Sequence, residues 1–181
     1  VTIYAPSYYD ELQYWLEYAI FHIPGVSAVR YPRGKSLYRP LEYRFSRKAF
    51  SLYGCDSPDV WLITYGKLFS FTVKAMEKLQ SQGLQIGVLK LNRIKPLDYE
   101  VFSIAAKARA LYFFEEGMQA GGIGEHFLAC MAERGYTGHC FLRGVGDHFV
   151  RHASMDESLA ELGLDTAGII QAVKTGEGEP V

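Results

Sequence analysis

The sequence predicts an α/β protein whose mostly parallel sheet carries helices on both faces. Between residues 59 and 174, short apolar runs typical of strands alternate with longer segments whose apolar residues recur at helical spacing. Glycines such as Gly83 and Gly135 follow the helical segments and end them. Strands that alternate with helices favour parallel pairing, because each connecting helix covers a face of the sheet. We therefore expect residues 59–174 to form a complete α/β domain.

A shorter α/β segment precedes this domain. Residues 2–5 and 26–29 are apolar runs typical of strands, and residues 8–22 between them carry apolar side chains at helical spacing. Ser7 is expected at the helix N-cap, followed by an acidic first turn. This order of strand, helix and strand predicts a right-handed βαβ unit with parallel strands.

The predicted βαβ unit, residues 1–34, is not expected to be a domain on its own. One unit cannot cover both faces of its sheet, and it leaves a strand edge unpaired. The sequence also begins directly in a strand-like run at Val1, without an initiator methionine. We therefore expect a fragment of a longer protein, with the rest of this sheet upstream.

Local patterns also predict helix starts and irregular segments. Asp98, Ser154 and Asp165 each precede a helical pattern and are expected N-caps, with a capping box at Ser154. Residues 92–96 are expected to form a loop, and residues 175–181 a frayed tail without an apolar pattern.

Residues 35–58 differ in composition from both α/β segments. Five basic residues stand against two acidic ones and are interleaved with aromatic residues. Basic and aromatic side chains together can bind single-stranded nucleic acid, but we favour a linker that lies over a neighbouring surface. Residues 49–53 are expected to pair with the next strand as a hairpin, closed by residues 54–58.

Composition limits the possible partners and the compartment. The 181 residues are 49% hydrophobic and 22% charged with a net charge of −1, so no overall attraction to nucleic acid is expected. No apolar run reaches the roughly 18 residues of a membrane span, and no signal peptide begins the sequence. Cys55, Cys130 and Cys140 form no CxxC pair and fit small buried residues in a reducing cytosol. We expect a cytoplasmic protein without membrane or nucleic-acid partners.

Two arginines follow the second predicted strand. Arg30 and Arg33 flank Tyr31-Pro32, and Pro32 biases Tyr31 toward extended geometry. Both guanidinium groups should therefore stand at the carboxyl end of a strand, where open α/β sheets bind ligands. A guanidinium can hold a phosphate or carboxylate with two parallel hydrogen bonds. The segment predicts an anion site, and salt bridges between domains are the alternative.

Two glutamates and a glycine-rich turn follow a later strand. Glu115 and Glu116 could act as acid and base, and Gly121-Gly122-Ile123-Gly124 before a helix could hold an anion. The turn matches neither a P-loop nor a dinucleotide fingerprint. We favour a structural role, with the glycines allowing close helix–strand contact and the glutamates pairing across an interface.

His148 and His152 are four residues apart and could bind a metal from one face of a helix. No third ligand is evident in the sequence. A hydrogen-bonded pair of structural histidines is the favoured interpretation.

Several short motifs occur in a fixed order along nearly the whole sequence. Together they resemble the C-terminal part of the 1-deoxy-D-xylulose-5-phosphate synthases, which belong to the transketolase family. Residues 35–58 depart from the family pattern, in a region where the family varies. The matching motifs are Tyr4-Ala5-Pro6-Ser7, Ala28-Val29-Arg30-Tyr31-Pro32-Arg33-Gly34, Lys95-Pro96-Leu97-Asp98, Glu115-Glu116-Gly117, Gly121-Gly122-Ile123-Gly124, Gly146-Asp147 with Phe149 and His152, and Glu161-Leu162-Gly163-Leu164-Asp165.

The resemblance implies a domain order. Residues 1–34 would be the last βαβ unit of a pyrimidine-binding domain, and residues 35–58 a linker. Residues 59–174 would be a transketolase-like C-terminal domain, and residues 175–181 a tail.

The resemblance also implies an activity for the full-length protein. That transferase would condense pyruvate with glyceraldehyde 3-phosphate to 1-deoxy-D-xylulose 5-phosphate, for isoprenoid (terpenoid) and thiamine biosynthesis. It would use thiamine diphosphate and Mg²⁺ and act as a cytoplasmic homodimer. The alternatives are a fragment of transketolase or of a 2-oxo-acid dehydrogenase beta subunit, or a non-catalytic module for oligomerisation or partner binding.

By the same resemblance, Arg33 matches the arginine that binds the phosphate of the aldehyde substrate. Arg30 is the second candidate and is better suited to holding the domain interface. The sequence lacks the GDG…N segment that binds Mg²⁺ and the glutamate that activates the cofactor's pyrimidine. The fragment alone is therefore expected to contain no catalytic residue, to bind neither cofactor nor metal, and to be inactive without the remainder of its chain.

Overall fold

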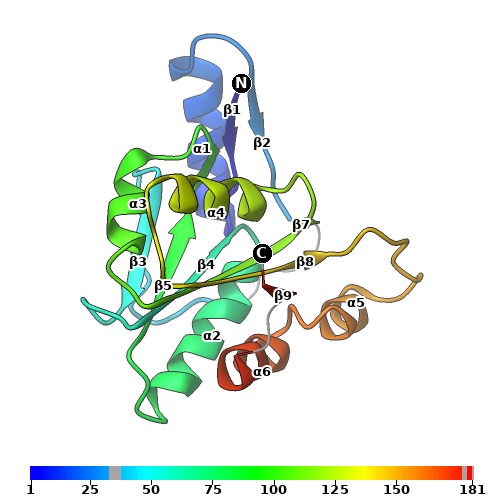
Figure 1. The fold of residues 1–181 in the computed structure, drawn as a ribbon. Coiled ribbons are helices and arrows are strands. Elements are labelled where there is room, and N and C mark those ends of the chain that lie inside the picture. The colour runs from blue at the N-terminus through cyan, green and yellow to red at the C-terminus, as the bar shows by residue number, and fades with distance from the viewer. Residues whose placement is uncertain (33–37, 177–178, 181) are drawn as a thin grey trace.

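A computed structural model describes residues 1–32, 38–176 and 179–180, and these build two β-sheets (Figure 1). The strands are β1 (Thr2–Tyr4), β2 (Ser27–Val29), β3 (Phe50–Gly54), β4 (Val60–Tyr65), β5 (Ile86–Leu91), β6 (Arg93–Lys95), β7 (Ala110–Met118), β8 (His139–Val145) and β9 (Glu179–Pro180). The smaller sheet has the order β2-β1-β6, and the larger has the order β3-β5-β4-β7-β8-β9.

The helices cover both faces of the larger sheet, as the sequence predicts. α2 and α6 pack on one face and α3 and α4 on the other, each side with its own apolar core (Figure 1). Every residue of β4 and β5 is buried, as expected for strands covered on both sides. None of the described helices is long and apolar enough to cross a membrane. The helices are α1 (Tyr9–His22), α2 (Leu68–Gln80), α3 (Tyr99–Ala105), α4 (Ile123–Glu133), α5 (Met155–Glu161) and α6 (Thr166–Thr175).

The larger sheet is mostly parallel, which confirms the predicted fold class. β5, β4, β7 and β8 all pair in parallel, and the two antiparallel strands, β3 and β9, lie at the edges. The predicted hairpin of residues 49–53 with the next strand is wrong, because β3 pairs with β5 and not with β4. Both edges of β4 are already occupied by β5 and β7, and β3 joins the sheet at the outer edge of β5.

Two segments predicted to be irregular contain short strands. The predicted loop over residues 92–96 contains β6, which pairs antiparallel with β1. β1 therefore has partners on both sides, and the expected unpaired edge of the βαβ unit is found only at β2 among the described strands. In the predicted tail, β9 pairs with β8. Neither strand exceeds three residues, so neither has a periodic signal in the sequence.

Helix starts follow the predicted caps with one exception. The side chains of Asp98, Ser154 and Asp165 all accept a hydrogen bond from the first turn of their helices. At α1, however, Tyr8 is the N-cap residue, and the Ser7 hydroxyl donates to the carbonyl of Gly66 at 2.6 Å. The predicted cap residue therefore connects α1 to the turn after β4.

A buried polar cluster joins α1, the linker and β5. Glu11 and Lys90 each expose 1% of their side chains, and the Lys90 ammonium donates to Glu11 Oε1 at 2.8 Å. The same ammonium donates to Asn92 Oδ1 at 2.5 Å, and the Tyr43 hydroxyl donates to Glu11. We call these four residues the Glu11–Lys90 cluster.

The linker packs on the body of the protein, in line with the favoured interpretation of its aromatic and basic residues. Tyr43 is buried beside Tyr8, and the Arg39 guanidinium lies 4.2 Å from the centroid of the Tyr43 ring. Its aromatic residues therefore contribute to the core around the Glu11–Lys90 cluster.

Candidate anion site at the end of β2

Arg30 stands directly after β2 and links the two sheets. Its backbone N–H donates to the carbonyl of Tyr4 at 2.8 Å, which continues the β1–β2 pairing. Its guanidinium lies 5.2 Å from the centroid of the Tyr65 ring, and one nitrogen lies 3.8 Å from Glu116 Oε2. The side chain is 41% exposed. Arg30 is therefore oriented by an aromatic face and a carboxylate but remains open to a ligand.

Arg33, the other arginine of the predicted site, lies outside the described residues. The description ends at Pro32 and resumes at Tyr38. Its role in binding the substrate phosphate stays a prediction.

A cavity of about 330 Å³ lies beside Arg30. Tyr31 and Pro32 line it next to Arg30, and Lys67 and Glu116 contribute the other charged groups. The other lining residues come mainly from α5 and the segments around it and are largely apolar: Val145, Met155, Ser158, Leu159, Leu162 and Leu164. The lining therefore combines charged groups with aliphatic side chains. We call it the Arg30–Lys67 cavity.

Lys67 is a residue of this site that the sequence analysis did not single out. It stands two residues after the end of β4, and β4 pairs in parallel with β7, whose carboxyl end carries Glu116. The rule that pointed to Arg30, a basic residue at the carboxyl end of a strand, applies equally to Lys67. Lys67 follows Tyr65-Gly66 and is not part of a recognisable motif. The sequence alone therefore did not distinguish it from an ordinary surface lysine.

Opposing effects act on the ionisation of Glu116. Burial raises the pKa of its carboxyl group, while the positive charges of Arg30 and Lys67 lower this pKa. The contact with Arg30 joins β7 to the segment after β2, so of the two glutamates Glu116 makes a pairing of the kind that the sequence predicts for both.

Glu115 has a different, structural role. Its carboxylate accepts hydrogen bonds from the Tyr65 hydroxyl at 2.8 Å and from the backbone N–H groups of Ile123 and Gly124 at 3.2 and 3.0 Å. It therefore occupies the N-terminus of α4, the position where an anion could otherwise bind. Burial raises the pKa of Glu115, and these hydrogen bonds oppose the shift.

The glycine-rich turn allows the close contact that the sequence analysis predicted. A methyl group on Gly124 would collide with the side chains of Leu142, Phe113 and Glu115. α4 can therefore approach β7 and β8 only because this residue is glycine.

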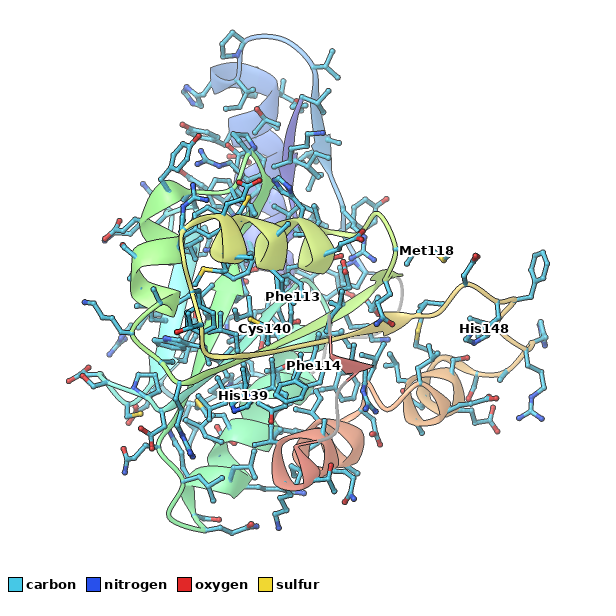
Figure 2. The ribbon with its side chains drawn as sticks, viewed as in Figure 1. Phe113, Phe114, Met118, His139, Cys140 and His148 are labelled. Atoms are coloured by element: carbon cyan, nitrogen blue, oxygen red, sulfur yellow. The ribbon has the colours of Figure 1, made fainter. Side chains whose placement is uncertain are left out.

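Both interpretations of the histidine pair are wrong. His148 and His152 lie in the exposed loop between β8 and α5, not on a helix, and Figure 2 shows His148 on this loop away from the sheet. No hydrogen bond joins them, and no group of three or more metal-binding side chains occurs among the described residues. Their spacing of four has no helical meaning, because the loop is irregular.

Figure 2 also shows Phe113 and Phe114 of β7 within the body of the protein.

The described residues do not fit thiamine diphosphate, the cofactor that the family resemblance implies. Glu115 fills the N-terminus of α4, and Glu116 is engaged with Arg30, so neither carboxylate is free to activate a pyrimidine. The described part of the chain also lacks a set of carboxylates that could hold a metal ion.

Comparison with known proteins identifies the family. A family model described as the C-terminal domain of transketolase matches residues 52–169, which is more than half of the chain. The chain belongs to this family. The match includes all of the larger sheet except its first two residues and its last strand.

Curated relatives of this transketolase-family chain are named 1-deoxy-D-xylulose-5-phosphate synthase. The protein from Pelotomaculum thermopropionicum is 34% identical over 96% of this chain, and the protein from Microcystis aeruginosa is 34% identical over 96%. In both comparisons the aligned region is 28% of the relative's length. The chain therefore corresponds to the C-terminal part of a transketolase-family enzyme and spans little more than a quarter of these relatives.

Solved structures agree with the fold. A structure described as a split-gene transketolase, an inactive beta4 tetramer, superposes with a TM-score of 0.77 at 20% identity and covers 96% of this chain and 57% of that one. Transketolase from Campylobacter jejuni gives a TM-score of 0.69 at 14% identity, covering 96% of this chain and 26% of that one. These likenesses support the transketolase-type fold of the chain.

Proposed function

We propose that this chain is the C-terminal part of an enzyme that condenses pyruvate with glyceraldehyde 3-phosphate, releasing carbon dioxide and forming 1-deoxy-D-xylulose 5-phosphate. The observation that carries the proposal is the segment Arg30-Tyr31-Pro32 at the carboxyl end of β2, beside a cavity, in a chain whose relatives bear this enzyme's name. Parallel sheets bind ligands at this end of their strands. The full-length protein would take part in isoprenoid precursor synthesis.

In this proposal, the parts of the chain have different roles. Arg33 binds the phosphate of the aldehyde, and Arg30 assists it while holding the interface with Glu116. Residues 1–34 belong to the pyrimidine-binding domain, residues 35–58 are the linker, and residues 59–174 support that domain and contribute to a homodimer in the cytoplasm.

The cofactors belong to the remainder of the protein. Thiamine diphosphate, held with Mg²⁺ by segments outside this chain, would supply the carbanion chemistry. This chain alone is expected to bind neither and to be inactive.

The proposal is tested by assaying the full-length protein with pyruvate and glyceraldehyde 3-phosphate in the presence of thiamine diphosphate and Mg²⁺. Formation of 1-deoxy-D-xylulose 5-phosphate with one equivalent of carbon dioxide is expected. Ketol transfer between sugar phosphates without release of carbon dioxide would instead indicate a transketolase, and absence of both reactions would contradict the proposed function.

The role of Arg33 gives a sharper test in the same protein. Arg33→Ala should raise the KM for glyceraldehyde 3-phosphate by about 10- to 100-fold with a smaller effect on kcat, because a charged hydrogen-bonded contact to the phosphate is lost. Arg44→Ala, which removes an exposed arginine of the linker, is the matched control and should leave KM unchanged. An unchanged KM with a reduced kcat in Arg33→Ala would contradict phosphate binding.

A further inference from the structure

Tyr65, the last residue of β4, lies beneath the guanidinium of Arg30. The centre of its ring is 5.2 Å from the guanidinium carbon, within the range of a cation–π contact. A methyl group on Gly66, the next residue, would lie 3.6 Å from a nitrogen of the Arg30 guanidinium, so this group extends along the end of β4. Tyr65 is 4% exposed, whereas the Arg30 side chain is 41% exposed. A buried ring therefore supports a guanidinium that is open to solvent.

Glu115 fixes the Tyr65 ring at its hydroxyl end. The hydroxyl donates to Glu115 Oε2 at 2.8 Å, and the same carboxylate accepts from the backbone N–H groups of Ile123 and Gly124 at the start of α4. Burial and the negative charge of Glu115 raise the pKa of Tyr65, so the hydroxyl keeps its proton and remains a donor. The ring is thus anchored to α4 through a buried carboxyl group.

The contact of Arg30 with Glu116 orients the guanidinium only weakly. One guanidinium nitrogen lies 3.8 Å from Glu116 Oε2, which is beyond hydrogen-bond distance. Partly exposed ion pairs of this kind hold a long side chain in one geometry at little net gain. The face of an aromatic ring, by contrast, favours a defined placement of the planar guanidinium against it. Of these two contacts, the one with Tyr65 is therefore better suited to orient Arg30.

We propose that Tyr65 is a positioning residue that orients the Arg30 guanidinium toward the phosphate of the aldehyde substrate, with Glu115 holding the ring in place. A guanidinium that is already oriented loses less conformational entropy when it binds a phosphate. Packing and hydrogen bonds behind a binding group keep it within the narrow range of geometries that binding requires. The phosphate contact of Arg30 rests on the function proposed above, whereas the contact between Tyr65 and Arg30 is a feature of the fold.

The kinetic test measures the KM for glyceraldehyde 3-phosphate in the full-length enzyme. Tyr65→Leu should raise this KM about three- to tenfold and leave the KM for pyruvate unchanged, because the cation–π contact that orients Arg30 is lost. Tyr65→Phe keeps the ring and should stay within about twofold of wild type. In an Arg30→Ala background, Tyr65→Leu should cause no further change, since Tyr65 acts through Arg30.

A matched control separates positioning from stability. Tyr112 of β7 is 5% exposed, and its ring stacks on Phe141 with 4.5 Å between the ring centroids. Tyr112→Leu therefore removes an equally buried phenol ring and should destabilise the fold, while the KM for the aldehyde stays at the wild-type value. An equal rise of this KM in Tyr112→Leu and Tyr65→Leu would show a general structural effect and overturn the proposal.

Two further results would overturn the positioning role. One is a wild-type KM in Tyr65→Leu, and the other is the same rise of KM with and without Arg30. If Tyr65→Leu does not fold, Tyr65→Met fills the space with an unbranched, adaptable side chain that has no ring. A raised KM for the aldehyde in Tyr65→Met supports the proposal, and a wild-type value contradicts it.

Crystal structures of the full-length variants give a measurement that does not depend on activity. The Arg30 guanidinium should keep its place in Tyr65→Phe and move by about 1 Å or more in Tyr65→Leu, a displacement large enough to weaken a positioned contact. An undisplaced guanidinium in Tyr65→Leu would overturn the positioning role. A displaced guanidinium in a protein without synthase activity would refute only the proposed function.

Discussion

Among the residues that the structure describes, Lys67 and Lys90 are buried, and their surroundings differ. Lys90, on β5, lies within the Glu11–Lys90 cluster, where a carboxylate and an amide oxygen accept from its ammonium. Lys67, after β4, lines a cavity and has no such acceptor among the described residues. A buried charge with its partners in place holds two parts of a chain together. Lys67 instead lines a cavity, and its ammonium is not sealed from solvent.

The pairing of Lys90 opposes the cost of its burial. Burial lowers the pKa of Lys90, and the negative charge of Glu11 acts in the opposite direction. Glu11 in turn accepts from the backbone N–H of Ser7 at 2.6 Å and from the Tyr43 hydroxyl. The cluster is thus satisfied from several elements, and loss of one member leaves the others unpaired.

Breaking the Glu11–Lys90 cluster is expected to have the largest effect on the free energy of unfolding. Lys90→Met should lower the free energy of unfolding by about 3–5 kcal/mol, because Glu11 would remain buried without a cation. Urea unfolding measures the change, and Lys78→Met on the exposed face of α2 is the control. The double variant Lys90→Met with Glu11→Leu should recover much of the loss. A single variant as stable as wild type would show that the pair contributes nothing.

Replacing Glu115 is expected to have an intermediate effect on the free energy of unfolding. Glu115 has hydrogen bonds but no cation in direct contact. Its pKa is raised in the folded state from the ordinary value of 4.5. The protonated carboxyl group therefore contributes its full share to the stability of the fold below pH 4.5. This stabilisation is lost as the pH rises through the folded-state pKa. Glu115→Gln stays neutral, so its stability relative to wild type should increase with pH above 4.5.

Urea unfolding of both proteins at a series of pH values measures this dependence. Glu100→Gln, at an exposed position in the first turn of α3, serves as the control. A stability difference between wild type and Glu115→Gln that moved in the opposite direction would contradict the raised pKa.

The smallest effect is expected from Lys67→Met. No direct partner among the described residues is lost, so the free energy of unfolding should change by less than about 1 kcal/mol, or increase. The measurement is the same urea titration, compared directly with Lys90→Met. A loss as large as that of Lys90→Met would show that Lys67 is structurally paired, and the contrast between the two lysines would disappear.

The sequence predicted what local patterns determine. Apolar periodicity gave the alternation of strands and helices, and side-chain chemistry next to each helix gave the caps at Asp98, Ser154 and Asp165. The glycine turn was correctly expected to allow close helix–strand contact, but Glu115 bonds to Tyr65 and the N-terminus of α4 and does not make the interface pairing predicted for both glutamates.

The sequence did not reveal contacts between distant residues. Glu11 belongs to the acidic first turn predicted for the first helix, yet its partner Lys90 is 79 positions away. The pairing of β1 with β6 and of β3 with β5 likewise depends on which strand edges remain free once the sheet has formed. Lys67 was missed because its significance lies in the cavity around it, which no local pattern encodes.

The pairing of β1 with β6 has a consequence for motion. β6 follows β5 after a single residue, and the backbone N–H of Ala5 donates to the carbonyl of Asn92 at 2.9 Å next to this pairing. Any hinge between the first βαβ unit and the larger sheet would have to break these backbone hydrogen bonds. The segment that carries Arg30 should therefore move with the larger sheet as one rigid body, and slow amide exchange along β1 would be its signature.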